Sequence, residues 1–394
     1  MAESRAEGDR PDGGRRGTRS GGRRSVHRFT RMVAAVVPLI LALIAAGCAG
    51  DAPEARPTAG VPTTAPPEPV PLTPEVAERA FRTYVTDEDV ARAAGDERLA
   101  LTWTSDGQSQ LTAAEFRKAA YDGDPVRRFV YDDPELYVPK LKDAAYPQWF
   151  LAVVNRSVLG EPESERRVLM AFVLRGPSDH WKLALATVLH RKVKLPEITV
   201  DDDGYAEPLS KDDPSLLIRP REMIGIHATV AAEGGRSVAA KVIRSSPITT
   251  GFYKESRRAK KKAKKDDLTL QVVFTATPFP YFGLRTEDGG GLIVYSMFRN
   301  TSLVAKKPGA PRPEIPEEAE HLLDGTVEGR QVDTGAIYHF AAYDPPRAGR
   351  NDKNDGAGRD GENGGEHEGR PKAHVIADEG AITKAAAPPP KEEP

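Results

Sequence analysis

The sequence predicts an α+β protein with two tandem small domains, each with helices packed on a curved antiparallel sheet, behind an amino-terminal leader and a Pro-rich tether. Three observations predict this class. Apolar stretches at 149–154, 167–174 and 181–189 are separated by short polar loops, which is typical of an antiparallel meander. Segments with a helical spacing of apolar residues precede these stretches. The same order of helices and then strands returns after residue 215.

The composition limits the class of protein. The chain has 394 residues, of which 39% are hydrophobic, and this is enough material for two domains of ordinary size. Cys48 is the only cysteine, so no intramolecular disulfide can form and the body must rely on its apolar core. The net charge of −2 argues against a dedicated nucleic-acid binder.

The amino-terminal segment resembles a bacterial lipoprotein signal. A basic region precedes the apolar run 32–44, and small residues at 45–47 lead to Cys48. The resemblance implies that residues 1–47 are a signal peptide cut off before Cys48 and that the Cys48 sulfur is lipidated. The acyl chains would then hold the body on the extracytoplasmic face of the cell membrane.

Two alternatives concern this segment. An uncleaved membrane anchor is disfavoured, because an apolar stretch of about 15 residues that contains Pro38 is shorter than the ~20 residues needed to span a bilayer. Arg23 and Arg24 raise the possibility of twin-arginine export. Only Val26 is apolar among the three residues that follow the pair, which favours general secretion while leaving both routes open.

The tether covers residues 48–73. Its closely spaced prolines favour an extended polyproline II conformation that cannot build a core. At ~3.1 Å per residue it could lift the body up to roughly 70 Å from the anchor.

Two helices are predicted at the start of the first domain, residues 74–196. Thr73 and Pro74 are typical of an N-cap followed by proline at the first helical position. The inward face of this helix is predicted to carry Ala77, Ala80, Phe81 and Tyr84. A second helix is predicted over 113–120, where a capping box and a hydrophobic staple have the correct spacing, with the pairs Thr112–Glu115 and Leu111–Phe116.

The strands of this domain follow the helices. Both faces of the stretch 149–154 are apolar, so we expect a helix to cover one face of the sheet and another layer to cover the other. Helices followed by a curved antiparallel meander resemble the cone-shaped NTF2-like fold. That resemblance implies an interior pocket, whose mouth Tyr131, Asp132, Asp133 and Tyr137 would line. The aromatic residues expected to fill the cone instead are Trp103, Trp149, Phe172 and Trp181.

An acidic linker is predicted over 197–214, followed by the second domain at 215–385. Its predicted helices are 220–232 and 257–265, and its predicted strands are 268–275, 281–286, 292–298, 336–343 and 374–383. The five residues at 287–291 are typical of a hairpin turn. The polar loop 345–372 and the tail 386–394 are expected to be disordered.

The second domain resembles an uncharacterised C-terminal domain of streptomycete lipoproteins. Two stretches carry the resemblance, Leu284-Arg285-Thr286-Glu287-Asp288-Gly289-Gly290-Gly291-Leu292-Ile293-Val294-Tyr295 and His374-Val375-Ile376-Ala377-Asp378-Glu379-Gly380. It covers residues 212–385 and implies a location and an architecture. It transfers no activity and no catalytic residue.

No catalytic, cofactor-binding or metal-binding residue is predicted, and no cofactor is expected. The histidines are scattered and form no HExxH motif, and His339 lies in an apolar strand as a core residue. The acidic stretch 201–204 fails the calcium-loop pattern, because Thr199 and Ser210 stand where ligands are required. The glycines 289–291 form a turn and no phosphate cradle.

The strongest charge feature is a basic stretch within the predicted helix 257–265. It consists of Arg257, Arg258, Lys260, Lys261, Lys262, Lys264 and Lys265. One interpretation is contact with an anionic surface, such as lipid headgroups or a wall polymer. The other is the solvated face of a helix whose Ala259 and Ala263 contact the sheet.

The sequence therefore predicts a lipid-anchored extracytoplasmic lipoprotein that acts as a non-catalytic binding or scaffolding module at the cell envelope. A carrier of small apolar ligands or an enzyme that uses a cone pocket is one alternative, and a subunit of an envelope complex is another. The expected partners are the membrane, through lipidated Cys48, and an envelope protein or an anionic polymer. No nucleic-acid partner is expected.

Overall fold

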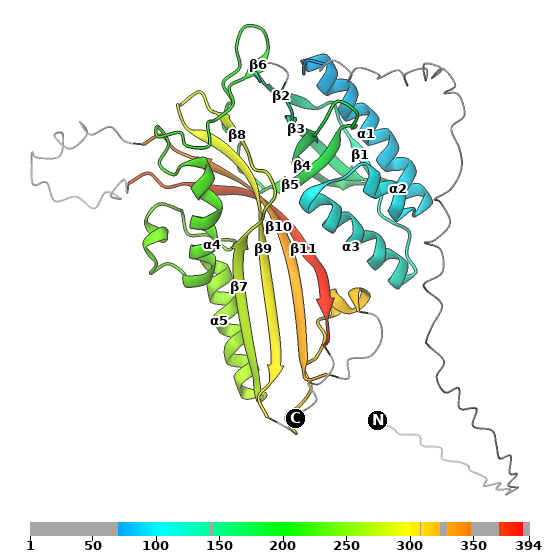
Figure 1. Ribbon diagram of the computed structural model, residues 1–394, viewed down its shortest axis with the longest axis vertical. Coiled ribbons are helices and arrows are strands. Elements are labelled where there is room, and N and C mark those ends of the chain that lie inside the picture. Colours follow the sequence, from blue (N-terminus) through cyan, green and yellow to red (C-terminus); the bar gives the residue numbers. More distant parts are fainter. Residues whose placement is uncertain (1–69, 142–144, 308, 324–328, 348–369, 389–394) are drawn as a thin grey trace, which may run out of the picture. The chain divides into compact units, whose positions relative to one another are not determined.

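Helices open each half of the fold, and strands follow them (Figure 1). The computed structural model describes residues 70–141, 145–307, 309–323, 329–347 and 370–388. The first half contains α1 (Pro74–Ala94), α2 (Glu97–Thr102) and α3 (Asp106–Asp122). The second half contains α4 (Met223–Glu233), α5 (Thr250–Lys265) and the short 3-10 helices η2 (Pro220–Glu222), η3 (Val238–Lys241) and η4 (Glu317–Leu322).

The strands described form one eleven-stranded sheet in the order β6-β2-β3-β4-β5-β11-β10-β9-β7, with β1 on β3 and β8 on β9. Those of the first half are β1 (Phe129–Tyr131), β2 (Glu135–Pro139), β3 (Gln148–Val158), β4 (Glu161–Leu174) and β5 (Lys182–Leu189). The others are β6 (Tyr205–Ala206), β7 (Leu268–Ala276), β8 (Phe282–Arg285), β9 (Gly291–Ala305), β10 (Gln331–Asp344) and β11 (His374–Ala386). Every pairing is antiparallel except the parallel pair β2·β6. The predicted α+β class is confirmed.

The junction between the halves is short. Strand β5 pairs with β11 only at Leu189↔Ala377 and Val188↔Asp378, whereas β10 pairs with β11 along nearly its whole length. The backbone amide of His190 adds a hydrogen bond to the Ile376 carbonyl at 2.9 Å. Beyond these residues, β11 leaves β5 and continues beside α3, with which it is in contact (Figure 1).

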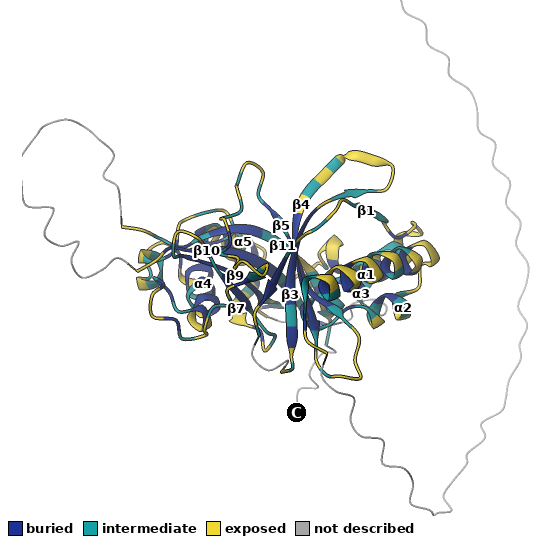
Figure 2. Ribbon diagram, turned by 90° about the horizontal axis from the view of Figure 1, so that it is seen from above, coloured by how far each residue is buried: buried dark blue, intermediate teal, exposed yellow. Residues whose placement is uncertain are grey.

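Both faces of the first meander are buried, as the sequence predicted. Phe150, Met170 and Phe172 pack under α1, whereas Leu151 and Leu169 face the other way. On that second face they meet residues of the second half, including Phe282, Leu292, Val294 and Ile376. The layer opposite the helix is therefore the other half of the chain. Figure 2 shows this seam as a buried centre between α1 and α3 on one side and α4 and α5 on the other.

The start of the second helix was predicted wrongly. Helix α3 begins at Asp106, and its N-cap Ser105 makes no side-chain cap hydrogen bond. Thr112 is buried inside the helix rather than at its end. The first turn carries Gly107, a weak helix former, and few apolar residues, so local periodicity could not detect it. Tertiary packing of that turn against β10 holds it instead.

Other expectations were met to different degrees. Thr73 caps α1 by accepting a hydrogen bond from the Val76 amide at 3.3 Å, as predicted. The hairpin β8–β9 and the helix at α5 are present. Helix α2 and strands β1 and β2 were missed because they are short, with three to six residues each. Within the predicted linker, Ile198 and Pro208 form bridges to Thr286 and Leu284.

Several predictions concern residues outside the described ranges. Cys48, the leader 1–47 and the tether up to residue 69 are among them, and so is most of the loop 345–372. The described residues all belong to one compact unit. Among the described residues, no helix is long and apolar enough to cross a membrane.

Candidate ligand-binding cleft

A cleft of about 1060 Å³ lies where β11 leaves β5. Helices α1 and α3 line one side and the ends of β3 and β4 another, and β10 and β11 line it together with residues of α5, β9 and η4. The cleft exists because the two halves pair at only two register positions. The strand edges therefore separate beyond the junction.

A buried ion-pair network forms one wall. Glu88 and Arg92 lie one turn apart on α1, and their side chains meet at 2.9 Å. Arg92 also pairs with Glu115 of α3 at 3.1 Å and donates to the backbone carbonyl of Arg127 at 2.9 Å. The Tyr131 hydroxyl donates to Glu88 at 2.7 Å. This wall is fully hydrogen-bonded around Arg92, whose side chain is only 5% exposed.

The electrostatics keep this network charged. Burial alone would lower the pKa of Arg92, but the carboxylates of Glu88 and Glu115 outweigh it and raise that pKa above its ordinary value. Burial raises the pKa of both Tyr84 and Tyr131, so these phenols stay protonated and act as neutral hydrogen-bond donors. The wall is therefore preorganised rather than poised for proton transfer.

Two further arginines face the cleft from the sheet. Arg156 of β3 and Arg166 of β4 stand directly opposite each other in the register. Arg156 is 15% exposed at its side chain, and its contact with Glu379 of β11 is long, at 3.5 Å. Its guanidinium also lies 4.4 Å from the ring centre of Phe129. In the described part of the chain, Arg166 makes no ion pair with an acidic side chain.

Apolar residues line other parts of the cleft, between further charged side chains such as Lys118, Asp122 and Arg299. Met170, Leu183 and Ala186 are buried at its base, and Leu111 and Ile382 line it from α3 and β11. A cleft that combines buried apolar residues with placed charged groups can serve as a small-molecule site.

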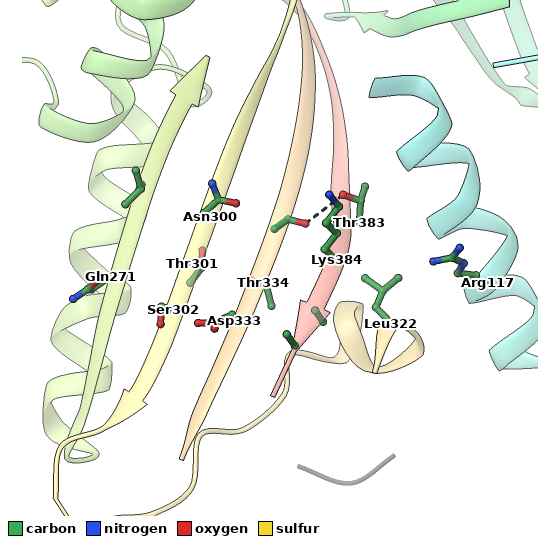
Figure 3. A pocket seen from close by; sticks show the side chains of 14 residues that line it. Arg117, Gln271, Asn300, Thr301, Ser302, Leu322, Asp333, Thr334, Thr383 and Lys384 are labelled. Atoms are coloured by element: carbon green, nitrogen blue, oxygen red, sulfur yellow. Dashed lines mark hydrogen bonds between the residues drawn. The ribbon is translucent and has the colours of Figure 1, made fainter. Parts of the chain in front are cut away.

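A second hollow of about 580 Å³ lies on the open face of β7, β9, β10 and β11 (Figure 3). Its side chains are mostly short and polar, such as Asn300, Ser302 and Thr334, and Thr383 donates to the Gly335 carbonyl at 3.4 Å. Val273 is 50% exposed there. This hollow has no buried charged network, so the cleft is the stronger candidate.

The predicted basic stretch lies on α5, and its seven cations are all exposed. Ala263 is buried against Leu268 and Ala305, so α5 packs on the sheet at this alanine, as one interpretation expected. None of the seven forms an ion pair with a residue that the structure describes. Arg257 lies over the ring of Tyr253, 5.7 Å from its centre.

The residues predicted to line a cone mouth do not form one group. Tyr131 lines the cleft, whereas Tyr137 points to the opposite face and bonds to Glu135. Asp132 and Asp133 are exposed. The aromatic residues also divide: Phe172 is in the core beneath α1, and Trp149 packs on Phe282 across the seam, 5.2 Å between ring centres.

His339 is a core residue, as predicted. It is fully buried, and its Nδ1 lies 3.0 Å from the Ala186 carbonyl. Its Nε2 has no hydrogen-bond partner among the described residues. Burial lowers the pKa of His339 to about 4, so the ring is neutral. No group of three or more metal-ligating side chains in the described ranges could hold a metal ion.

The sequence interpretation missed the charged residues of the cleft. One signal was available on α1, whose inward positions continue from Tyr84 to Glu88, Ala91 and Arg92 at helical spacing. Charged residues on a buried stripe are uncommon unless they are paired. The partners Glu115, Arg156 and Glu379 come from distant parts of the chain, and no local pattern connects them.

Comparison with known proteins places the chain in a family without an assigned activity. Residues 68–385 match a domain of unknown function (DUF8094), so the chain belongs to that family. An uncharacterized lipoprotein of Streptomyces avermitilis is 26% identical over 227 residues, which is 56% of this chain and 63% of that protein. A second, from Streptomyces coelicolor, is 25% identical over 279 residues, or 68% of this chain and 79% of the relative. No solved structure matches. The resemblance to streptomycete lipoproteins of unknown function is confirmed.

Proposed function

We propose that this protein is a lipid-anchored binding protein of the cell envelope that holds a small ligand in the cleft and does not transform it. The cleft of about 1060 Å³ with its buried, preorganised charges is the observation that carries the proposal. Lipidation of Cys48 would place the body on the extracytoplasmic face of the membrane. The naming of both relatives as lipoproteins supports this address.

The energetics of the charged wall favour a binding role. A buried ion pair contributes little net stability, because desolvation of the two charges offsets their attraction. An apolar wall would stabilise the fold equally well. Glu88, Arg92 and Glu115 therefore make better sense as a rigid polar wall for a ligand than as a stabilising device.

A contact between α5 and an anionic surface belongs to the same proposal. Its seven cations have no acidic partner in the described ranges, so they are available to a lipid headgroup layer, an anionic polymer or an acidic envelope protein. Cations near an anionic membrane contribute about 1 kcal/mol each. The lipid would hold the protein at the membrane, and α5 would orient the body on the anionic surface.

The two halves are also proposed as two α+β units of NTF2-like or cystatin-like type, at 74–196 and 215–385, that pack on each other. The repeated order of helices and then a meander supports this, as does the two-position junction between β5 and β11. The segment 197–214 would connect them.

Native mass spectrometry of the intact lipoprotein, extracted from its membrane, tests the binding role. Ala381 lines the cleft and is exposed, so Ala381→Trp places a bulky ring in the cleft without disturbing the core. We expect a bound small molecule on the parent protein and its loss from this variant. The matched control is Val273→Trp, which fills the second hollow and should retain the ligand. Equal ligand occupancy in both variants would refute a site in the cleft.

A further inference from the structure

We infer that the ligand is an acidic amphiphile whose acid group bridges Arg156 and Arg166, with its apolar part over the base of the cleft. This inference rests on the proposed function and adds the chemical class of the ligand. Phosphate and carboxylate share the required chemistry, since both accept paired hydrogen bonds from guanidinium groups.

The register of β3 and β4 carries the first step. Arg156 and Arg166 are directly opposite in an antiparallel pair, which puts both side chains on the same face. Like charges in this position repel each other and destabilise the sheet. Both residues line the cleft. An anion between the two guanidinium groups would convert this repulsion into attraction.

The hydrogen bonding of Arg156 carries the second step. A guanidinium has five N–H donors. Within the described ranges, the side chain of Arg156 makes a single hydrogen bond, to Glu379. Its length of 3.5 Å is long for an N–H···O hydrogen bond. Arg92 in the same cleft has three acceptors between 2.9 and 3.1 Å. Arg156 therefore retains more donors for a ligand than Arg92 does.

Glu379 defines a second feature of the ligand. Its Oε1 contacts Arg156, but its Oε2 is buried and has no hydrogen-bond partner among the described residues. A buried acceptor without a donor is costly. A hydroxyl group next to the acid group of the ligand would donate to this oxygen. The site thus favours a head that combines an acid with a hydroxyl.

The size and walls of the cleft indicate the rest of the ligand. A volume of about 1060 Å³ far exceeds what a free phosphate or carboxylate needs. Leu111, Ala119 and Ile382 line the cleft and are half-buried, so they provide apolar surface beyond the arginine pair. An aliphatic chain attached to the acidic head would cover this surface.

The test measures binding to the intact lipoprotein in phosphatidylcholine nanodiscs, with empty nanodiscs as the blank. Lysophosphatidic acid supplies acid, hydroxyl and chain; oleate lacks the hydroxyl, monoolein lacks the acid, and inorganic phosphate lacks the chain. We expect lysophosphatidic acid to bind most tightly and monoolein at least roughly tenfold more weakly. If monoolein or inorganic phosphate binds as tightly as lysophosphatidic acid, or if no acidic probe binds, the inference is overturned.

Variants identify the residues. Arg166→Gln and Arg156→Gln should each weaken the binding of lysophosphatidic acid by roughly tenfold or more. Arg156→Lys should lose less of this affinity than Arg156→Gln. Arg167→Gln is the matched control, because Arg167 points to the other face and pairs with Glu135, so its affinity should stay within about twofold. Arg166 is half-buried, so its variant remains informative if changes at Arg156 prevent folding.

The outcomes separate this inference from the proposed function. Loss of binding in Ala381→Trp with unchanged affinity in both arginine variants would leave the cleft as the site and overturn the acidic ligand. Unchanged binding in Ala381→Trp would overturn the proposed function itself. Weakening in the arginine variants and not in Arg167→Gln supports the inference.

Discussion

Acidification is expected to destabilise this fold through its buried histidines, and His339 gives the clearest case. Burial lowers the pKa of His339 to about 4, and that of His227 also to about 4, from an ordinary value of 6.5. The pKa of each ring is lower in the folded state, so below pH 6.5 the histidines of the unfolded chain are protonated while those of the folded chain stay neutral. The stability from each neutral histidine is therefore present above pH 6.5 and is lost as the pH falls towards 4.

The magnitude follows from the shift. One pKa unit corresponds to about 1.4 kcal/mol, so a shift of roughly 2.5 units removes about 3 kcal/mol per histidine between pH 7 and pH 4. Asp344 acts in the opposite direction, because burial raises its pKa to about 7 from 3.8. Its contribution is present below pH 3.8 and is lost as the pH rises through 7. The stability lost at the two histidines exceeds the stability gained at the one carboxyl, so acidification lowers the free energy of unfolding.

The variant His339→Asn isolates one of these contributions. The asparagine amide can donate to the Ala186 carbonyl as the ring Nδ1 does, but it does not titrate. We expect the free energy of unfolding, from urea titrations followed by circular dichroism at pH 4.5 to 7.5, to change less steeply with pH. The reduction in slope should be about 1.4 kcal/mol per pH unit between pH 4.5 and 6.

A matched control uses the exposed Val238, which carries no titratable group, and its change to Ala should leave the slope unaltered. The variant's own cost at neutral pH does not matter, because only the slope is compared. If His339→Asn and the parent protein show the same slope, the buried ring is not the acid-sensitive group and the reasoning is refuted.

Three further predictions concern packing, the charged wall and the basic helix. Gly107→Ala should destabilise the fold by about 1–3 kcal/mol in urea titrations, because the added Cβ would lie 2.4 Å from Nε2 of His339. The control is Gly225→Ala on α4, whose Cβ would meet no atom within 4 Å, so this change should be neutral or stabilising. Arg92→Met should cost about 3–5 kcal/mol by the same assay, since Glu88 and Glu115 lose the guanidinium that pairs with both of them. The exposed Arg117→Met should cost under about 1 kcal/mol. The basic helix is tested by sedimenting the intact lipoprotein, held in phosphatidylcholine nanodiscs, with vesicles that contain phosphatidylglycerol. The fraction of protein that sediments with the vesicles should fall when Lys260, Lys261 and Lys264 are changed to Gln. It should not fall when the exposed Arg191, Lys192 and Lys194 are changed to Gln.

Local patterns predicted the elements whose structure depends on local chemistry. Thr73 and Pro74 defined the start of α1 because capping involves residues three positions apart. The alternation along 268–275 predicted β7, whose Leu268 and Phe274 are buried while Thr269 and Gln271 are exposed. These features need no information from the rest of the chain.

Features that depend on distant contacts were missed or misplaced. The first turn of α3 is held by contact of Gly107 with His339, more than two hundred positions away in sequence, so its own residues carry no strong signal. The cleft has the same origin. Glu379 approaches Arg156 only because β11 crosses to the first half, and no spacing in the sequence indicates that crossing.

The junction and the cleft are two consequences of the same strand. Strand β11 joins β5 at two positions and then leaves it, so the residues just after the junction, beginning with Glu379, line the cleft opposite Arg156 and Arg166. A ligand held between these residues contacts both halves of the chain at once. Because such a site exists only when the halves are joined, binding must stabilise the junction by an amount that grows with ligand concentration above its dissociation constant. Ligand binding and the stability of the seam are therefore thermodynamically linked. Because the junction between β5 and β11 is so short, the stabilisation that a bound ligand adds is large relative to it.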